Sequence, residues 1–122
     1  MCIDDYREYN YVLYLDKPEL IYSICGDFFT LNTIKAVHSV ELSPVPLTLE
    51  LLMLCNVTIQ VSNDIVKLIF NGVSVELNLV TGLCQVFDSN DIMNDTIYKS
   101  IKHLHQLQNI IYKHTGIRLL MK

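Results

Sequence analysis

Residues 58–87 read TIQVSNDIVKLIFNGVSVELNLVTGLCQVF, with apolar and polar side chains alternating between short polar turns. Alternation with a period of two is typical of strands that bury one face. Asn71-Gly72 is a strong signal for a two-residue hairpin, because both residues tolerate the positive φ that a type I′ turn requires. This turn places Lys67 opposite Glu76, and an opposite-charge pair supports the register.

The same register continues into a four-stranded antiparallel meander over residues 58–87. A turn at residues 63–64 adds a strand before the central hairpin, and a turn at residues 81–82 adds one after it. The second turn sets Leu77 opposite Val86. One face of the meander is then apolar and requires a cover. This face comprises Ile59, Val61, Val66, Leu68, Phe70, Val73, Val75, Leu77, Leu79, Cys84 and Val86.

A C-terminal helix over residues 94–115 is expected to provide that cover. Asp91, Asn94 and Asp95 offer N-cap chemistry, and Gly116 offers a left-handed stop. Between these ends, residues of one helix side recur at helical spacing, and most of them are apolar. They are Ile97, Ile101, Leu104, Leu107 or Gln108, Ile111 and Thr115.

The chain before the meander is predicted to hold a short helix and a small β-layer. The helix covers residues 48–55, with Thr48 as its cap and Asn56 as a left-handed exit. Residues 1–43 are β-rich, with Gly26-Asp27 as one turn. The expected strands are Tyr11–Leu15, Leu20–Cys25, Phe28–Leu31 and Val37–Leu42. Residues 1–122 are therefore predicted to form a single α+β domain.

Composition supports one globular domain inside a cell. The chain has 122 residues, of which 51% are hydrophobic and 18% charged, so a real core is expected. The longest apolar runs are too short to span a membrane. Residues 1–10 contain no apolar run, so we expect no signal peptide and an intracellular location. The scattered cysteines are then expected to be reduced thiols. They are Cys2, Cys25, Cys55 and Cys84.

Charge is distributed unevenly along the chain, whose net charge is −4. Residues 96–122 contain five basic and no acidic side chains. One hypothesis is that the exposed side of the C-terminal helix is a polar partner-binding stripe. The alternative is that Gln108 and His105 are partly buried and hydrogen-bond to backbone at a sheet edge. The stripe would comprise Lys99, Lys102, Gln106, Asn109 and Lys113.

Two segments carry a family resemblance. Residues 42–57, LSPVPLTLELLMLCNV, resemble a PIPLTEExLLKCGF segment, and residues 103–116, HLHQLQNIIYKHTG, resemble YVHQLQNLYFALTG. Both occur in this order in a family of small uncharacterised proteins of Bacteroidetes phages and prophages, as does a GNYV segment similar to residues 10–12. This chain departs from the family at Asn56, where glycine is usual, and at residues 113–114, where apolar residues are usual. The resemblance implies a phage accessory protein acting in the host bacterial cytoplasm, and it assigns no catalytic residue.

No catalytic, cofactor or metal site is predicted from the residues. His103 and His105 invite a metal interpretation together with His114, but helical residues two apart point in different directions. Neither Cys25 nor Cys84 has a histidine partner that the sequence places nearby. An enzyme is therefore not expected.

Three functions follow as hypotheses. The leading one is stoichiometric binding of a host protein, such as a defence component, or of a small signalling nucleotide. The second is a nucleic-acid-associated replication or packaging accessory that uses the basic helix and the N-terminal tyrosines, although the acidic pI of about 5.4 argues against it. The third is a homo-oligomer formed through Ile65, Ile69 and Phe87 on the outer face of the meander.

Overall fold

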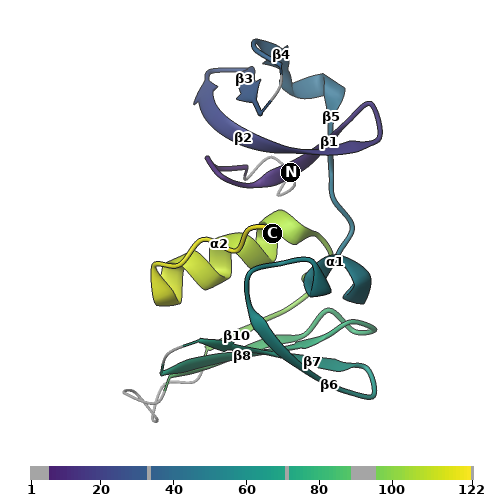
Figure 1. Cartoon of the computed structure of the whole chain (residues 1–122), viewed down its shortest axis with the longest axis vertical. Helices are drawn as coiled ribbons and strands as arrows, with labels where there is room; N and C mark the ends of the chain where they lie inside the picture. The colour runs from purple at the N-terminus through teal and green to yellow at the C-terminus, as the bar shows by residue number, and fades with distance from the viewer. Residues whose placement is uncertain (1–5, 33, 71, 89–95, 122) are drawn as a thin grey trace. The chain divides into compact units, whose positions relative to one another are not determined.

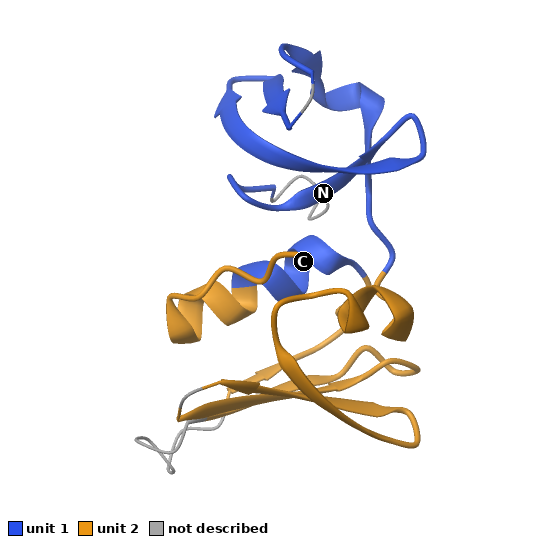
Figure 2. Cartoon of the chain, in the orientation of Figure 1, with its two compact units in different colours: residues 1–46, 103–109 blue, residues 47–102, 110–122 orange. Residues whose placement is uncertain are grey.

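The computed structural model describes residues 6–32, 34–70, 72–88 and 96–121. These residues form two five-stranded antiparallel sheets and one main helix, α2 (Leu104–Thr115), so the protein is mixed α/β (Figure 1). The chain divides into two compact units, residues 1–46 with 103–109 and residues 47–102 with 110–122 (Figure 2). Helix α2 therefore contributes its first half to unit 1 and its second half to unit 2. That residues 1–122 act as one domain stays a prediction.

The sheet of unit 1 follows the predicted strands closely. Its strand order is β4-β3-β2-β1-β5. The predicted strand 37–42 is interrupted by a 3₁₀ helix, η2, because the His38 ring caps it by accepting a hydrogen bond from Val40 N at 3.2 Å. The elements are β1 (Tyr11–Tyr14), β2 (Lys17–Cys25), β3 (Phe28–Leu31), β4 (Val37–His38), η2 (Ser39–Glu41) and β5 (Leu42–Pro44).

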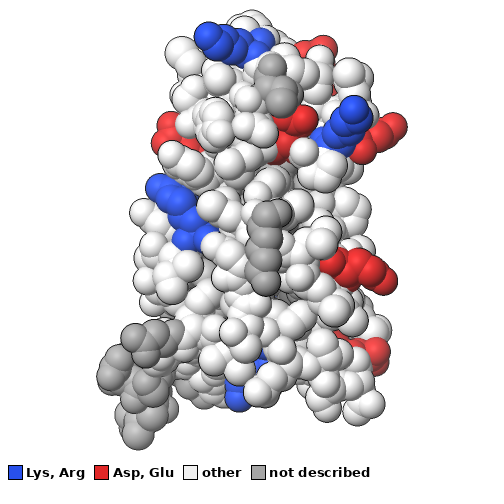
Figure 3. Space-filling view, in the orientation of Figure 1, with Lys and Arg blue, Asp and Glu red and all other residues white. Residues whose placement is uncertain are grey.

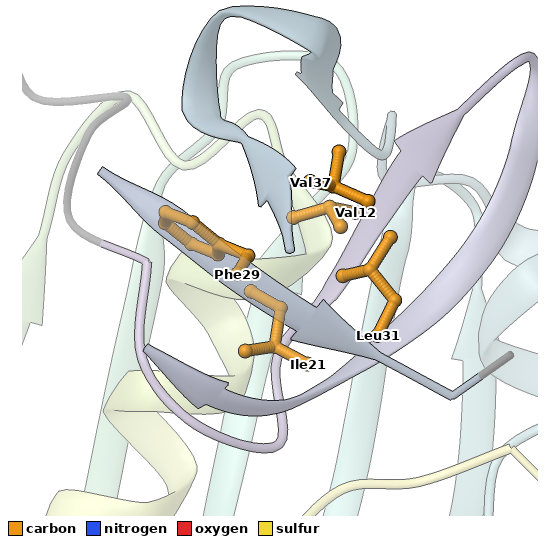
Figure 4. Packing of buried hydrophobic residues seen from close by; sticks show 5 residues of the cluster. All are labelled: Val12, Ile21, Phe29, Leu31 and Val37. Carbon is orange, nitrogen blue, oxygen red and sulfur yellow. The ribbon is translucent and has the colours of Figure 1, made fainter. Parts of the chain in front are cut away.

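The core of unit 1 is a cluster of aliphatic side chains around one phenylalanine (Figure 4). The members come from four neighbouring strands, so their burial holds these strands together. Burial of each such side chain stabilises a fold by about 1.5–3 kcal/mol before entropy is counted. The cluster comprises Val12, Ile21, Phe29, Leu31 and Val37.

The sheet of unit 2 contains the predicted meander and has the strand order β10-β9-β8-β7-β6. Lys67 lies opposite Glu76, and Val61 lies opposite Val66, as predicted. Asn71 lies outside the described residues, and Gly72 has the expected positive φ of 81°. The elements are α1 (Leu49–Met53), β6 (Thr58–Ser62), β7 (Ile65–Phe70), β8 (Val73–Asn78), β9 (Cys84–Asp88) and β10 (Thr96–Tyr98).

The predicted register between β8 and β9 is wrong by two residues. Leu77 lies opposite Cys84 rather than Val86. The cause is Asn78, whose side-chain oxygen accepts hydrogen bonds from Val80 N at 2.9 Å and Thr81 N at 3.0 Å. This Asx-type contact draws the residues after Asn78 out of the strand and into a longer loop.

The predicted helix 94–115 is also wrong at its start. Residues 94 and 95 lie outside the described part, and residues 96–98 form β10, a fifth strand paired with β9. Threonine, isoleucine and tyrosine favour strands, and a paired neighbour lies beside them. Ile97 therefore lies opposite Gln85 and is 54% exposed, although it was expected on the buried side of the helix. The helix begins only at Leu104.

The short helix and the chain's last residues meet through Asn56. The predicted Thr48 cap is confirmed, since its side chain accepts a hydrogen bond from Leu51 N at 3.2 Å. Asn56 does not take the predicted left-handed conformation. Instead Asn56 hydrogen-bonds to the last residues of the chain. Its backbone N–H donates to Leu120 O at 2.8 Å, and its Oδ1 accepts from Leu120 N at 3.0 Å. Gly116 ends α2 with a φ of 72°, as predicted.

The inner face of the second sheet is buried along its three central strands. Within unit 2, the second half of α2 lies over this face (Figure 2). Its Ile110 and Ile111 are buried, at 6% and 0% exposure. Among the described residues of unit 2, the second half of α2 therefore covers this inner face. The fully buried sheet residues are Val66, Leu68, Val75, Leu77 and Cys84.

Candidate functional site

The segment HQLQN of α2 anchors the N-terminal segment of unit 1. Gln108 is 4% exposed, and its amide satisfies two backbone groups at the entrance to β1. Its Nε2 donates to Tyr9 O at 3.0 Å, and its Oε1 accepts from Tyr11 N at 2.9 Å. The interpretation of Gln108 as a buried residue that hydrogen-bonds to backbone is therefore confirmed.

Asn109 and Gln106, two residues of the proposed stripe, have intramolecular roles. Asn109 Oδ1 accepts a hydrogen bond at 2.9 Å from Nδ2 of Asn10, which is buried. Gln106 Oε1 accepts from His103 N at 3.0 Å, which satisfies a backbone donor at the start of the helix. Both side chains are half-buried. Each side chain thus makes a hydrogen bond within unit 1.

The lysines of the stripe do not share one helix face. Lys99 and Lys102 are exposed but precede α2, so their predicted position on the helix is wrong. Lys113 is exposed in the last turn of the helix, where a cation suits the helix dipole. Nearby, the Arg118 guanidinium lies 4.8 Å from the centre of the Tyr112 ring. Of the five residues predicted for the stripe, Gln106, Asn109 and Lys113 lie on α2.

The histidines are held by aromatic neighbours. His105 is fully buried, with its ring 4.7 Å from that of Tyr6. His114 Nε2 lies 2.8 Å from the Tyr98 hydroxyl, which joins α2 to β10 within unit 2. Among the described residues, no three histidine, cysteine, aspartate or glutamate side chains lie close enough to hold a metal ion.

Two of the described cysteines are buried in unit 2, whereas Cys25 is exposed at the end of β2. Burial raises the pKa of Cys55 from 9.0 to about 11 and that of Cys84 from 9.0 to about 12. Cys2 lies outside the described residues. A raised thiol pKa means that the folded state resists ionisation, so this contribution to stability is complete below pH 9 and is lost as the pH rises toward 11–12.

Selective alkylation should follow from this difference. At pH 8 only about one in a thousand Cys55 thiols, and fewer for Cys84, would be the reactive thiolate, and burial blocks reagent access. We expect iodoacetamide to modify Cys25 in the native protein, and Cys55 and Cys84 only after denaturation. Peptide mass spectrometry before and after urea measures this. Rapid native modification of Cys84 would contradict the burial of β9.

The face of the second sheet that lies opposite the second half of α2 is the candidate binding surface. We call it the outer face, and it comprises the outward side chains of the five strands. Ile65 is 40% exposed and Ile97 is 54% exposed, and Ile69 and Phe87, which flank Ser74, are half-buried. Lys67 on β7 and Glu76 on β8 lie directly opposite each other, so the two charges of this face balance. The other members are Thr58, Gln60, Ser62, Lys67, Ser74, Glu76, Asn78 and Gln85.

A hollow of about 370 Å³ lies at the β6 side of this face. Its walls include Gln60 and Ser62 of β6, Ile65 and Lys67 of β7, and Glu76 of β8. Val61 also lines it and is 49% exposed, although its partner Val66 is fully buried. The alternation of the sequence placed Val61 on the covered side. Val61 is exposed because β6 is the end strand of the described sheet.

A second hollow of about 460 Å³ lies in unit 1, beside η2 and the β2–β3 turn. Its walls combine apolar side chains, Ile24, Phe29 and Leu42 among them, with polar groups that line a comparable area. Asp27 is its charged residue, and Ser39 adds a hydroxyl. A pocket of this kind suits a neutral or cationic ligand, because a carboxylate repels phosphate.

Among the described helices, none has the length and apolar character that a membrane crossing requires. On the surface drawn in Figure 3, basic and acidic side chains are interspersed among uncharged residues. No protein-family model, curated protein or solved structure matches the chain.

Proposed function

We propose that this chain is a non-enzymatic protein that acts by stoichiometric binding of one partner protein. The setting is the one its resemblance implies, an accessory protein of a phage inside a bacterial host, and a defence component is the partner class we propose. The outer face of the second sheet is the observation that carries the proposal. Exposed apolar side chains gathered on one sheet face are typical of protein–protein contact surfaces.

The chemistry of the outer face favours a protein over other partners. The centre of a protein interface is poor in charge and rich in apolar and aromatic side chains. Here Ile69 and Phe87 flank Ser74 in the row beside the central Lys67–Glu76 pair, whose two charges balance each other. The face is thus close to neutral although the chain carries −4. We expect a partner whose contact surface is apolar at its centre.

A signalling nucleotide is a weaker candidate. Phosphate groups are held by cations or by converging N–H donors. The hollow in unit 1 carries the carboxylate of Asp27, and Lys67 in the other hollow lies opposite Glu76. Both arrangements oppose a polyanion. We therefore place sequestration of a nucleotide behind contact with a protein.

Nucleic acid is also a weaker candidate than a protein. A nucleic-acid surface needs several cations in line to displace counterions from the phosphates. The basic residues after position 95 are separated in the fold: Lys99 and Lys102 precede α2, and Lys113 lies in its last turn. A gel-shift titration at low salt should show no shifted band of nucleic acid below micromolar protein concentration.

Capture from host lysate with matched variants tests the proposal. Ile65→Lys places a cation on the outer face, whereas Val80→Lys makes the same type of change at a 73% exposed loop position off that face. We expect a protein captured at about one-to-one stoichiometry by the wild type and by Val80→Lys, and at least about tenfold less by Ile65→Lys. Equal capture by all three, or native mass spectrometry showing a bound nucleotide instead, would refute the proposal.

A further inference from the structure

Among the described residues, strand β6 is the end strand of its sheet, and its sequence is self-complementary. It reads Thr-Ile-Gln-Val-Ser. All of its residues except Ile59 are exposed. Natural edge strands are usually protected by charges, proline or a bulge. Residues 56–63 contain no charged residue and no proline, and the pairing of β6 with β7 is regular.

The sequence of β6 is a near-palindrome centred on Gln60. Reversed, it places a hydroxyl residue opposite a hydroxyl residue, Thr58 with Ser62. It also places one β-branched aliphatic residue opposite another, Ile59 with Val61. Two copies running antiparallel through Gln60 would therefore pair like with like at every position. Such cross-strand matches stabilise antiparallel pairs.

The hydrogen-bonding phase of β6 fits the same axis. The turn at residues 63–64 is closed by Ser62 opposite Ile65. In a two-residue hairpin this pair exchanges its backbone hydrogen bonds, and every second pair repeats the exchange. Ser62, Gln60 and Thr58 thus direct their backbone groups toward β7. Ile59 and Val61 direct theirs toward the free edge.

We propose that two copies of this chain associate by antiparallel pairing of β6 with β6, about a two-fold axis through Gln60. Ile59 of one copy then exchanges backbone hydrogen bonds with Val61 of the second copy, and the reverse pair does the same. The two sheets become one ten-stranded sheet. Val61, half exposed on the inner face, is covered by Ile59 of the second copy.

The same geometry explains why the occupant is a second copy rather than an arbitrary peptide. Any extended peptide can satisfy the free backbone groups of an edge strand. Only an antiparallel copy reproduces the palindrome and brings the two Gln60 side chains together on the axis. No like charges meet there, because the nearest charged residue along the chain is Asp64. Since each copy carries −4, added salt should strengthen the pairing by screening.

Sedimentation velocity on the full chain tests the pairing in the absence of any partner protein. We expect the wild type to be a dimer at about 100 μM and to dissociate on dilution. Gln60→Glu is the informative variant. Within one copy the new carboxylate lies opposite Lys67, which is favourable, whereas across the axis it meets its own counterpart. Dimerisation should weaken by about tenfold or more, with partial recovery in high salt.

Ser74→Glu is the matched control. It adds the same charge to the same face, on β8 and away from the edge. It should leave edge pairing unchanged. If Ser74→Glu dissociates the dimer and Gln60→Glu does not, the copies pair through the outer face and our proposal is wrong. A wild type that stays monomeric at 100 μM would also overturn it.

Disulfide trapping provides a second, geometric test. Residues on the axis form a non-hydrogen-bonded pair with Cα atoms about 4.5 Å apart, within the range that a disulfide spans. In a background with both Cys2→Ser and Cys25→Ser, Gln60→Cys should form a covalent dimer under mild oxidation, and Ser74→Cys should not. Equal cross-linking of both variants would contradict the axis. None of these readouts depends on the proposed binding function, so either idea can fail without the other.

Discussion

Gly82→Ala is expected to destabilise the protein by about 2–5 kcal/mol, because two separate penalties meet at this position. Gly82 has a φ of 76°, which an L side chain rarely adopts. An added Cβ would lie 3.0 Å from Ile101 N and 3.1 Å from Ile101 O, and backbone atoms cannot rotate away. The contact also carries a hydrogen bond from Ile101 N to Gly82 O at 2.8 Å. Urea unfolding should report a lower midpoint with an unchanged slope.

Two other glycines separate the penalties. Gly26 has a φ of 59° and Gly116 a φ of 72°, and an added Cβ would meet nothing within 4 Å at either. Alanine there should cost only the left-handed conformation, about 1–2 kcal/mol. The excess loss at Gly82 then measures how tightly the β8–β9 loop packs on the segment before α2. Equal losses at all three positions would show that this approach is looser than the structure has it.

The central hairpin could be predicted because its signals are local. The turn dipeptide at residues 71–72, the alternation on either side and the Lys67–Glu76 pair lie within a few residues of each other. Each points to the same register, and that register is observed. The register of the next strand, β9, was predicted wrongly because it depends on the hydrogen bonds that the Asn78 side chain accepts in the loop before it. A pattern of apolar residues carries no information about these bonds.

The start of the C-terminal helix could not be predicted for a different reason. Ile97 and Ile101 have helical spacing with Leu104, so the periodicity continued into a segment that is not helical. Residues 96–98 form a strand because they pair with β9. The position of β9 beside them is set by the tertiary fold and not by the local sequence. Tertiary pairing decides in favour of a strand here, over the local periodicity.

The candidate site depended on the same kind of long-range contact. Asn109 appeared in the sequence as an exposed helix residue, but its partner Asn10 lies 99 positions away. The sequence did predict that Gln108 hydrogen-bonds to backbone, and could not say to which strand. Val61 shows the converse case, because alternation predicts which face a residue occupies but not whether the strand lies at the end of its sheet.

Gln108→Ala is expected to be among the most destabilising polar substitutions in this chain, by about 2–4 kcal/mol. The truncation removes both hydrogen bonds of a buried amide, leaving Tyr9 O and Tyr11 N without these partners. It also leaves a cavity where the side chain was 4% exposed. Tyr9 has a φ of 69°, so its strained backbone loses a contact that holds it in place.

Gln108→Glu separates the hydrogen bonds from the packing, because the side chain keeps its size. At neutral pH the new carboxylate faces Tyr9 O and can no longer donate to it, so the variant should be destabilised nearly as much as Gln108→Ala. Burial beside a carbonyl raises the pKa of such a carboxyl group. The protonated form can donate, so the deficit relative to wild type should shrink below about pH 4 and grow as the pH rises.

Gln106→Ala, at a half-buried capping position, should cost only about 1 kcal/mol. If amide exchange at Tyr11 is unchanged in Gln108→Ala, α2 does not hold β1 through this side chain, and the HQLQN segment needs another explanation.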